Sequence, residues 1–541
     1  MALSKPSITE LMQMVKASIK QYRADQAAQI ATSVIPPRIS PSPLVTMANI
    51  SEEIEYSSRT VDQEVDTVAI CPLHPDYMII GTYSLLKKDE PCDYNGQKRR
   101  GSLQVATVMS TFKPRYVGML PPSLDRVDFP CAVLDTHFHP SDSTLLGVAT
   151  SNATVHLFRF TIHGDVLGRR VITKLLPLGT VRVANNDEHG LVPLLTQFTW
   201  FPETRTHGVV GISDVVDVGF AATTSFGDAR VVRISVPAVK DLFDERADQP
   251  PQALVPISND IVHSHELEAW TVAVLDLGSS SWDGNRSTSR VILSGGDDSA
   301  LVASSVSPST IPNHPSAPNS TSLSPCNTLS LNTMPLWRDR RSHTAGVVSI
   351  LPLPPITVRS GNGGDNRRDV IPLATGSYDE YIRLFEIDTQ TYRASFKTEL
   401  RVDGGVWRLK VLDQYSTRKE GQAQLQHHTL VLASLMHAGA AIIRITRTTV
   451  TSSSSQGDTW TIAPVTIFRA GHESMVYCCD ARLEDGNANG SSQDQPQKGR
   501  EQAGEGSPAG AAPAYTIVSS SFYDMKICTW RFVDHLKAQS Q

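Results

Sequence analysis

The 541-residue sequence lacks the features that define several large classes of protein. No apolar run reaches the roughly 18 residues that a membrane-spanning helix needs, and the N-terminus has no compact apolar stretch of the kind found in secretory signals. The seven cysteines follow no spacing pattern, as expected for reduced thiols in the cytosol or nucleus. The net charge of -6 argues against nucleic-acid binding as the main role, although it leaves room for local basic patches.

The familiar catalytic motifs are missing as well. There is no H-E-x-x-H, no paired C-x-x-C, no phosphate-binding loop and no dinucleotide fingerprint. The segment Gly211–Val215 approaches the G-x-S-x-G nucleophile elbow but fails at its last position. We therefore expect neither a metal nor a cofactor, and the motifs alone do not indicate an enzyme. A non-catalytic interaction scaffold is the default interpretation at this point.

What the sequence has in abundance is one repeated pattern, in which an apolar strand, small polar residues, an acid or its substitute and a second strand follow each other. Gly, Asn and Asp suit the tight turn between two such strands. The pattern resembles the WD repeat and predicts an all-β fold, a seven-bladed WD-repeat β-propeller over residues 51–535. The six clear units and a weaker seventh lie at 146–152, 221–228, 293–298, 374–379, 432–437, 518–524 and 68–83.

The spacing of these units exceeds that of a compact WD repeat, and insertions explain the excess. Residues 307–333 are rich in Ser, Pro, Asn and Thr, and residues 484–513 in Gly, Gln, Ser and Pro. Such compositions bury too little apolar surface to fold, so we expect two disordered loops. Residues 1–50 form an N-terminal extension, and apolar positions at helical spacing predict a helix near 8–28. A docking helix is the favoured interpretation; a targeting segment and disorder are the alternatives.

Several His and Asp residues occupy positions that the repeat itself requires. A His before the innermost strand of a blade and an Asp in the following turn hold the loops of a WD blade together. We therefore interpret six residues as structural rather than catalytic: His265, Asp298, His343, Asp379, His472 and Asp524.

Departures from the repeat are more informative. His437 stands where the other units carry an acid, which puts a group that titrates near neutrality on an exposed turn, although a harmless substitution explains it too. Glu268 and Trp270 interrupt one loop entry, and Gly404 and Gly405 replace the His of another, just before Trp407. Tyr83, Tyr378 and Tyr523 recur at turn positions, with Phe226 and Met436 at related ones. These side chains predict either an aromatic-lined recess at one mouth of the propeller or core packing between blades.

Certain strings together resemble a particular family, the WD-repeat diphthine methyl esterases of the diphthamide pathway. They are the segments 265–270, 293–298, 343–347, 374–380, 404–408, 436–439 and 521–524, and the resemblance covers roughly residues 66–532. It implies hydrolysis of the methyl ester of methylated diphthine, a modified histidine on translation elongation factor 2. The product, diphthine, is the substrate of the final amidation.

From the same resemblance we expect a cytoplasmic monomer whose partner is elongation factor 2. A scaffold that binds elongation factor 2 or other proteins without turnover, for example in endosomal trafficking, is the alternative.

Ester hydrolysis needs a base to activate water and donors for the developing oxyanion. Our hypothesis from the sequence makes His437 the general base, oriented by Glu268. Tyr378 or Tyr523 would stabilise the oxyanion together with the amides of Gly404 and Gly405. Trp270 and Trp407 would flank the modified imidazole, and aromatic faces would attract the trimethylammonium group of the substrate.

Overall fold

The structure is a computed structural model, and the residues it describes are 54–86, 99–108, 124–165, 170–203, 205–209, 212–238, 251–276, 290–308, 331–359, 367–418, 424–450, 458–484 and 512–538. These residues are almost entirely β-strand. The one helix among them, α2 (His535–Ala538), has four residues, so no helix in this part of the chain could cross a membrane. The predicted helix near 8–28 and the whole extension 1–50 lie outside the described residues.

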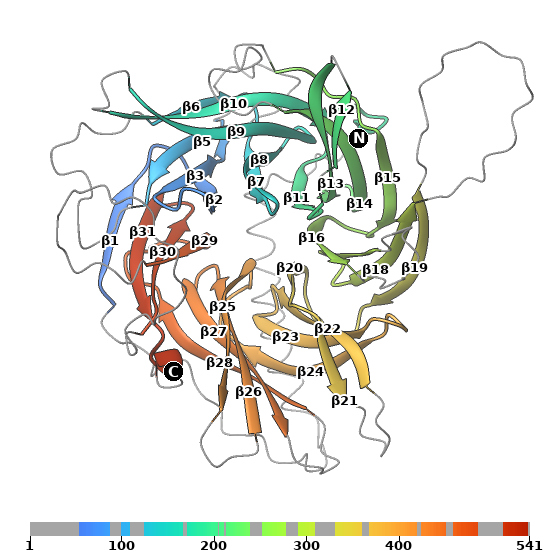
Figure 1. Cartoon of the computed structure of the whole chain (residues 1–541), viewed down its shortest axis with the longest axis vertical. Helices are drawn as coiled ribbons and strands as arrows, with labels where there is room; N and C mark the ends of the chain where they lie inside the picture. The colour runs from blue at the N-terminus through green and yellow to red at the C-terminus, as the bar shows by residue number, and fades with distance from the viewer. Residues whose placement is uncertain are drawn as a thin grey trace, which may run out of the picture. The chain divides into compact units, whose positions relative to one another are not determined.

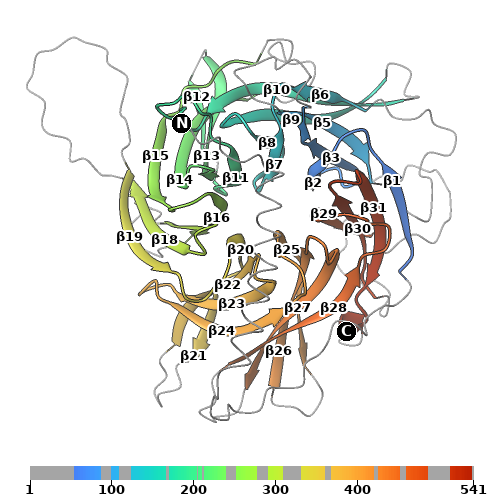
Figure 2. The ribbon, with the colours of Figure 1, turned by 180° about the vertical axis from the view of Figure 1, so that it is seen from behind.

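Seven antiparallel sheets surround a common axis, as Figure 1 shows from one end and Figure 2 from the other. The fold is a seven-bladed β-propeller, as the repeat predicted. Blade 1 comprises β2 (Val65–Ile70), β3 (Tyr77–Thr82) and β5 (Arg99–Thr107), with β4 (Ser84–Leu85) and β6 (Arg126–Phe129). Blade 2 comprises β7 (Val133–His139), β8 (Asp142–Thr150), β9 (Thr154–Gly164) and β10 (Val171–Arg182). Blade 3 comprises β11 (Leu195–Trp200), β13 (Ile212–Thr224), β14 (Asp228–Pro237) and β15 (Ser258–Ser264), with β12 (Arg205–Val209).

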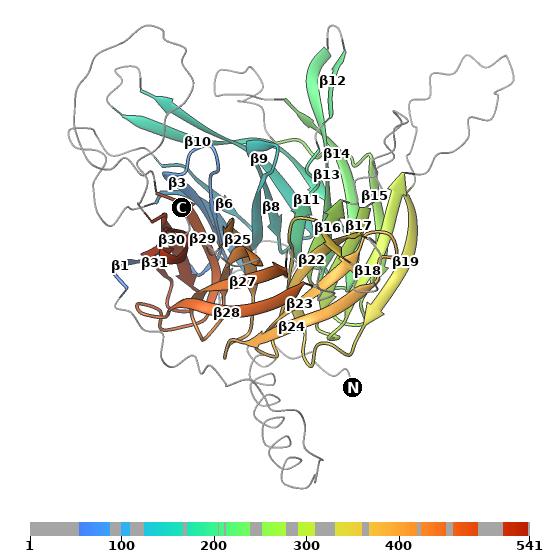
Figure 3. The same cartoon turned by 60° about the horizontal axis from the view of Figure 1, so that its bottom comes forward.

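The remaining four blades continue around the ring, and Figure 3 shows the sheets from the side, with the β12–β13 hairpin extending beyond its neighbours. Blade 4 comprises β16 (Ala269–Asp276), β17 (Arg290–Gly296), β18 (Leu301–Pro308) and β19 (Leu331–Asp339), and blade 5 comprises β20 (Val347–Pro352), β22 (Arg367–Ser377), β23 (Tyr381–Asp388) and β24 (Ala394–Arg401), with β21 (Ile356–Arg359). Blade 6 comprises β25 (Arg408–Arg418), β26 (Gln424–Ser434), β27 (Ala440–Val450) and β28 (Thr459–Phe468). Blade 7 comprises β29 (Val476–Leu483), β30 (Ala514–Ser521), β31 (Lys526–Val533) and β1 (Tyr56–Thr60).

Blade 7 combines the two ends of the described chain. Strand β1 pairs antiparallel with β31, with Tyr56 opposite Trp530 and Thr60 opposite Lys526. The first described strand thus completes the last sheet and closes the ring, which removes the exposed edge that an open sheet would leave.

Both predicted insertions include residues at their ends that the structure assigns to the blades. Residues 307–308 belong to β18 and residues 331–333 to β19, because both strands continue their pairing to Pro308 and Leu331. The other insertion begins after Glu484, whose N–H donates to the Ala514 carbonyl at 2.8 Å, and it ends before Pro513, whose carbonyl accepts from Asp534. The segments between, 309–330 and 485–511, lie outside the described residues.

The blades pack through apolar layers between neighbouring sheets, and polar side chains on the innermost strands join one blade to the next. Asp135 accepts a hydrogen bond from the Phe198 N–H at 3.1 Å, and Asp480 accepts one from the Ile70 N–H at 2.8 Å. The side-chain carbonyl of Gln197 accepts a hydrogen bond from the Val272 N–H of blade 4 at 2.9 Å. Each of these groups satisfies a buried backbone donor of the adjacent blade, so they fix the ring near its axis.

The histidines interpreted as structural are buried and hydrogen-bonded within their own blades. His265 contacts Asp298 at 2.8 Å and Ser294 at 2.7 Å. His472 contacts Ser519 and Ser521, both at 2.8 Å. Burial lowers the pKa of both rings, to about 4 for His472, so they act as neutral connectors between loop and sheet.

Blade 5 uses a different set of partners. His343 contacts Thr375 at 2.9 Å, but Asp379 pairs with Arg383 at 2.8 Å and accepts from the Thr344 N–H. In blade 7, Asp524 likewise accepts hydrogen bonds from the loop that carries His472 rather than from the ring itself. The turn acids of these two blades therefore hold backbone and loop groups, which are the contacts that a structural role requires.

Candidate functional site

The residues singled out by the sequence gather at one end of the propeller. Because the strands of each blade are antiparallel, the turns β17–β18, β22–β23, β26–β27 and β30–β31 lie at the same end as the loops that lead into β16, β20, β25 and β29. We call this end of blades 4 to 7, near the propeller axis, the mouth.

An aromatic cluster occupies the mouth, with Trp407 at its centre. The Trp407 ring centroid lies 5.7 Å from that of Trp270, 6.1 Å from that of Tyr378 and 5.2 Å from that of Tyr477. Further ring contacts extend the cluster, whose members are Tyr83, Trp270, Tyr378, Trp407, Tyr477, Phe522 and Tyr523. The structure therefore brings together the predicted Trp270, Trp407, Tyr378 and Tyr523, and it adds Tyr477.

An acidic pair borders this cluster on blade 4. The Asp297 N–H donates to the Glu268 carbonyl at 2.9 Å, so the two residues are neighbours through the backbone. A Cβ built on Gly346 would lie 2.8 Å from Asp297 Oδ1 and 3.0 Å from Tyr378 Cδ2, so the glycine lets the carboxyl and the phenol ring approach each other. Asp297 thus reaches the aromatic cluster from the turn between β17 and β18.

Burial raises the pKa of Asp297 to about 6, and the nearby charges of Glu268 and Asp298 add to the effect. The Trp270 indole N–H faces this carboxyl and opposes the shift, but it does not reach hydrogen-bond geometry and has no other partner in the described part of the chain. The Asp297 carboxyl has no hydrogen-bond partner among those residues either. A buried carboxyl of this kind is a candidate general base near neutral pH.

Two further groups at the mouth keep donors unused. Burial raises the pKa of Tyr378, so its phenol stays protonated, and its hydroxyl contacts no partner in the described residues. The Arg408 guanidinium carbon lies 5.0 Å from the Trp407 ring centroid, and its Nη1 donates to the Trp407 carbonyl at 3.1 Å. The unused donors of Tyr378 and Arg408 are therefore open to water or to a ligand at the mouth.

Asp66, on the innermost strand β2, lies near enough for the Arg408 charge to act on its carboxyl. Burial raises the pKa of Asp66 to about 7, and Arg408 opposes that rise. In the described chain the two groups form no ion pair within 4.0 Å. Asp66 is therefore a second perturbed carboxyl near the mouth, on the opposite side of the axis from blade 4.

His437 lies at the same end but apart from the acidic pair. It is exposed in the turn after β26, where Met436 has a φ of 47° and pairs through its backbone with Val476. No hydrogen bond or ion pair links His437 to Glu268 or to any other residue that the structure describes. The orienting contact that our sequence hypothesis gave it is therefore absent, and its role as a base stays a prediction.

Gly404 and Gly405 pack against that same turn. A Cβ on Gly404 would overlap the Leu435 carbonyl oxygen, and one on Gly405 would lie 2.7 Å from Met436 Sδ. Close packing of the β26–β27 turn is thus a sufficient reason for both glycines, and their role as oxyanion donors also stays a prediction.

Sequence reasoning missed four members of the site: Asp66, Asp297, Arg408 and Tyr477. A signal existed for Asp297, because the turn of blade 4 carries two consecutive acids where the other units carry one. No comparable signal marked Asp66, whose proximity to Arg408 depends on closure of the ring.

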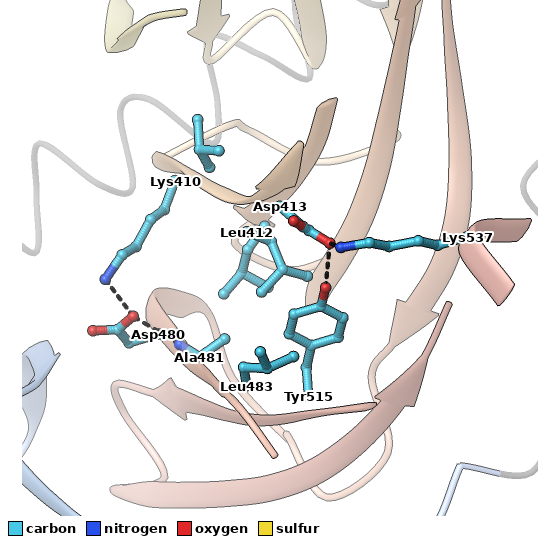
Figure 4. Close-up of a pocket in the computed structure, with 10 residues that line it drawn as sticks. Lys410, Leu412, Asp413, Asp480, Ala481, Leu483, Tyr515 and Lys537 are labelled. Atoms are coloured by element: carbon cyan, nitrogen blue, oxygen red, sulfur yellow. Dashed lines mark hydrogen bonds and ion pairs between the residues drawn. The ribbon is translucent and has the colours of Figure 1, made fainter. Parts of the chain in front are cut away.

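A separate cavity of about 140 Å³ lies between blades 6 and 7, away from the mouth (Figure 4). Its charged groups are paired with one another. Lys537 contacts Asp413 at 2.7 Å, Tyr515 donates to the same carboxylate, and Lys410 pairs with Asp480. The charged groups of this cavity are thus held in ion pairs and hydrogen bonds with one another. The described residues also hold no group of three His, Cys, Asp or Glu side chains suited to a metal ion.

The fold and the site define a seven-bladed propeller with an aromatic and charged mouth, and comparison with known proteins narrows this class. No protein-family model matches the chain. A curated protein of Schizosaccharomyces pombe named Diphthine methyltransferase is 23% identical over 481 residues, which cover 88% of this chain and 97% of that protein. The chain is therefore distantly related to the WD-repeat proteins of the diphthamide pathway.

Two solved structures match this chain at low similarity. The crystal structure of Saccharomyces cerevisiae Sqt1 matches with a TM-score of 0.37 and 11% identity, over 88% of this chain and 98% of that one. Chaetomium thermophilum Sqt1 bound to the N-terminus of ribosomal protein L10 matches with a TM-score of 0.36 and 11% identity, over 85% of each chain.

Proposed function

We propose that this protein hydrolyses the methyl ester of methylated diphthine on translation elongation factor 2. The observation that carries the proposal is the juxtaposition of an aromatic cluster with an unpaired carboxyl of raised pKa, Asp297. Aromatic faces attract a quaternary ammonium group, and a carboxyl that titrates near neutrality accepts a proton from water. The distant relation to Diphthine methyltransferase supports a substrate from the same pathway.

The proposed reaction needs only water and the side chains of the mouth. Asp297 accepts a proton as water attacks the ester carbonyl carbon, and the Tyr378 phenol donates a hydrogen bond to the developing oxyanion. The bond from carbon to methoxy oxygen then breaks, and protonated Asp297 returns its proton to the leaving oxygen. The products are a carboxylate, methanol and one released proton.

Glu268 and Asp297 have different roles in the proposed reaction. Glu268 and the faces of Trp270 and Tyr378 hold the trimethylammonium group, while Asp297 performs the proton transfer. Because the pKa of Asp297 is about 6, the carboxyl is mostly ionised at pH 7 and still close enough to neutrality to return the proton. We place Asp297 ahead of His437 as the base because it contacts the aromatic cluster, whereas His437 has no contact that orients it.

The name of the S. pombe relative makes methyl transfer the competing reaction, and one experiment separates the two. The purified chain is incubated with elongation factor 2 carrying methylated diphthine, with no methyl donor added. A parallel sample holds elongation factor 2 carrying diphthine together with S-adenosylmethionine. Hydrolysis lowers the mass of the first substrate by one methylene and releases methanol; transfer raises the mass of the second by the same amount.

The expected result is loss of mass in the first sample and no change in the second. Asp297→Asn, which keeps the shape of the side chain, should reduce the rate by about a hundredfold or more, in the range of general base catalysis. Binding of elongation factor 2 with no change in mass in either sample would refute the proposal and favour the scaffold alternative.

A further inference from the structure

Arg408 is a partly buried arginine that has no acidic partner among the described residues. A guanidinium has five N–H donors, but here only Nη1 is used, toward the carbonyl oxygens of Trp407 at 3.1 Å and Val348 at 3.4 Å. Arg383, one blade away, shows the usual arrangement, because it pairs with Asp379 at 2.8 Å and with Glu399 at 3.0 Å. Nε and Nη2 of Arg408 therefore remain available at the mouth.

The Arg408 charge acts on the carboxyls of Asp135 and Asp66, but neither carboxyl accepts a hydrogen bond from Arg408. Asp135 is held by His137 at 2.9 Å and by the Phe198 N–H at 3.1 Å. Asp66 lies outside ion-pair distance of Arg408. A partly buried guanidinium with a free edge is suited to bind a carboxylate through two parallel hydrogen bonds.

Charge is also separated across the aromatic cluster. The acids Asp297 and Glu268 lie on the blade 4 side, and Arg408 lies on the blade 6 side, over the face of Trp407. Because Arg408 already covers that face, an organic cation is better placed against Trp270 and Tyr378, next to the acids. The mouth thus offers a place for a positive group and a place for a negative group on either side of the same rings.

We propose that the mouth is a binding site for betaines, zwitterions in which a quaternary ammonium and a carboxylate are a few bonds apart, with the carboxylate held by Arg408. The inference rests on the proposed function and deepens it. Ester hydrolysis creates a carboxylate beside an ammonium, so Arg408 distinguishes product from substrate. The protein therefore binds its product more tightly than the neutral ester, and small betaines compete for the same site.

Binding without turnover tests this inference. The full-length chain is titrated with glycine betaine and with choline, which share a trimethylammonium group and differ in carboxylate against hydroxyl. Heat release and the fluorescence of Trp270 and Trp407 report binding. We expect glycine betaine to bind about tenfold more tightly, as for a hydrogen-bonded charge pair.

Arg408→Met should remove the preference and leave choline binding intact, while Arg408→Lys, which keeps the charge but loses the fork, should reduce it. Arg418→Met, an exposed residue at the far end of the same strand, is the matched control and should keep the preference. Should Arg408→Met not fold, Arg408→Lys decides the question alone.

The betaine site would be overturned by equal binding of the two ligands by the wild-type chain, or by an unchanged preference in both Arg408 variants. Absence of binding by either ligand would overturn it as well. Failure of the esterase assay with the betaine preference intact would instead refute the proposed reaction, so the two proposals fail separately.

Discussion

Asp297→Asn should make the protein more stable at neutral pH while it reduces the rate of hydrolysis by about a hundredfold or more. Burial raises the pKa of this carboxyl in the folded state to about 6, from the 3.8 of an exposed aspartate. The folded state therefore holds the proton more tightly than the unfolded state, and stability falls as the pH rises between these two values. The difference corresponds to about 3 kcal/mol, an upper bound because water reaches the mouth. The neutral amide of the variant does not incur this loss.

Urea unfolding of the wild type and the variant at pH 7.5 and at pH 4 measures the effect. We expect the variant to be more stable by about 1–3 kcal/mol at pH 7.5, with the gain nearly gone at pH 4, where wild-type Asp297 is protonated. The neighbouring Asp298 is the control of opposite sign. Burial opposes its ionisation, but the hydrogen bonds from His265 and from the N–H groups of Glu266 and Ala300, together with the His265 charge, outweigh burial and lower its pKa. Asp298→Asn should therefore destabilise the protein at pH 7.5. Equal or lower stability of Asp297→Asn at that pH would refute the reasoning.

Three further substitutions test other parts of the site. Trp270→Ala removes one cation-binding face and should raise KM by several-fold, about 1 kcal/mol, with a smaller change in kcat. Gly404→Ala forces a Cβ onto the Leu435 carbonyl and should destabilise the protein by about 1–3 kcal/mol, whereas Gly164→Ala, with nothing within 4 Å, should not; thermal unfolding compares them. His437→Ala should keep nearly full esterase activity if Asp297 is the base, and loss of activity in a folded His437 variant would restore the hypothesis from the sequence.

The fold could be predicted from the sequence because every blade carries the same signals at the same positions. Turn residues between apolar strands are local features, and local features determine a hairpin without knowledge of the rest of the chain. The closure through β1 could not be predicted in this way, since the pairing of Tyr56 with Trp530 joins opposite ends of the described chain and nothing local specifies it. The ends of the insertions were misplaced for a related reason, because β18 and β19 continue into a polar composition that pairing with each other stabilises.

The site was predictable only where it broke the repeat. Trp270, Trp407 and Tyr378 attracted notice because the repeat does not require aromatics there, and the structure brings them into contact. Arg408 escaped notice because a basic residue at the start of a strand is ordinary in sequence. Its lack of an acidic partner is a property of the assembled ring, and the sequence does not record it.

The repeat supplies an internal standard for separating structural from functional residues. In blades 4 and 7 a buried histidine, His265 or His472, forms hydrogen bonds within the blade. In blade 5, Arg383 pairs with the turn acid Asp379. The fold thus shows repeatedly how a propeller of this sequence satisfies its own polar groups. Asp297, Tyr378 and Arg408 depart from this standard together, at one end of the axis and beside the same aromatic cluster. We propose that a ligand that carries both charges uses the hydrogen-bonding capacity that these groups leave open.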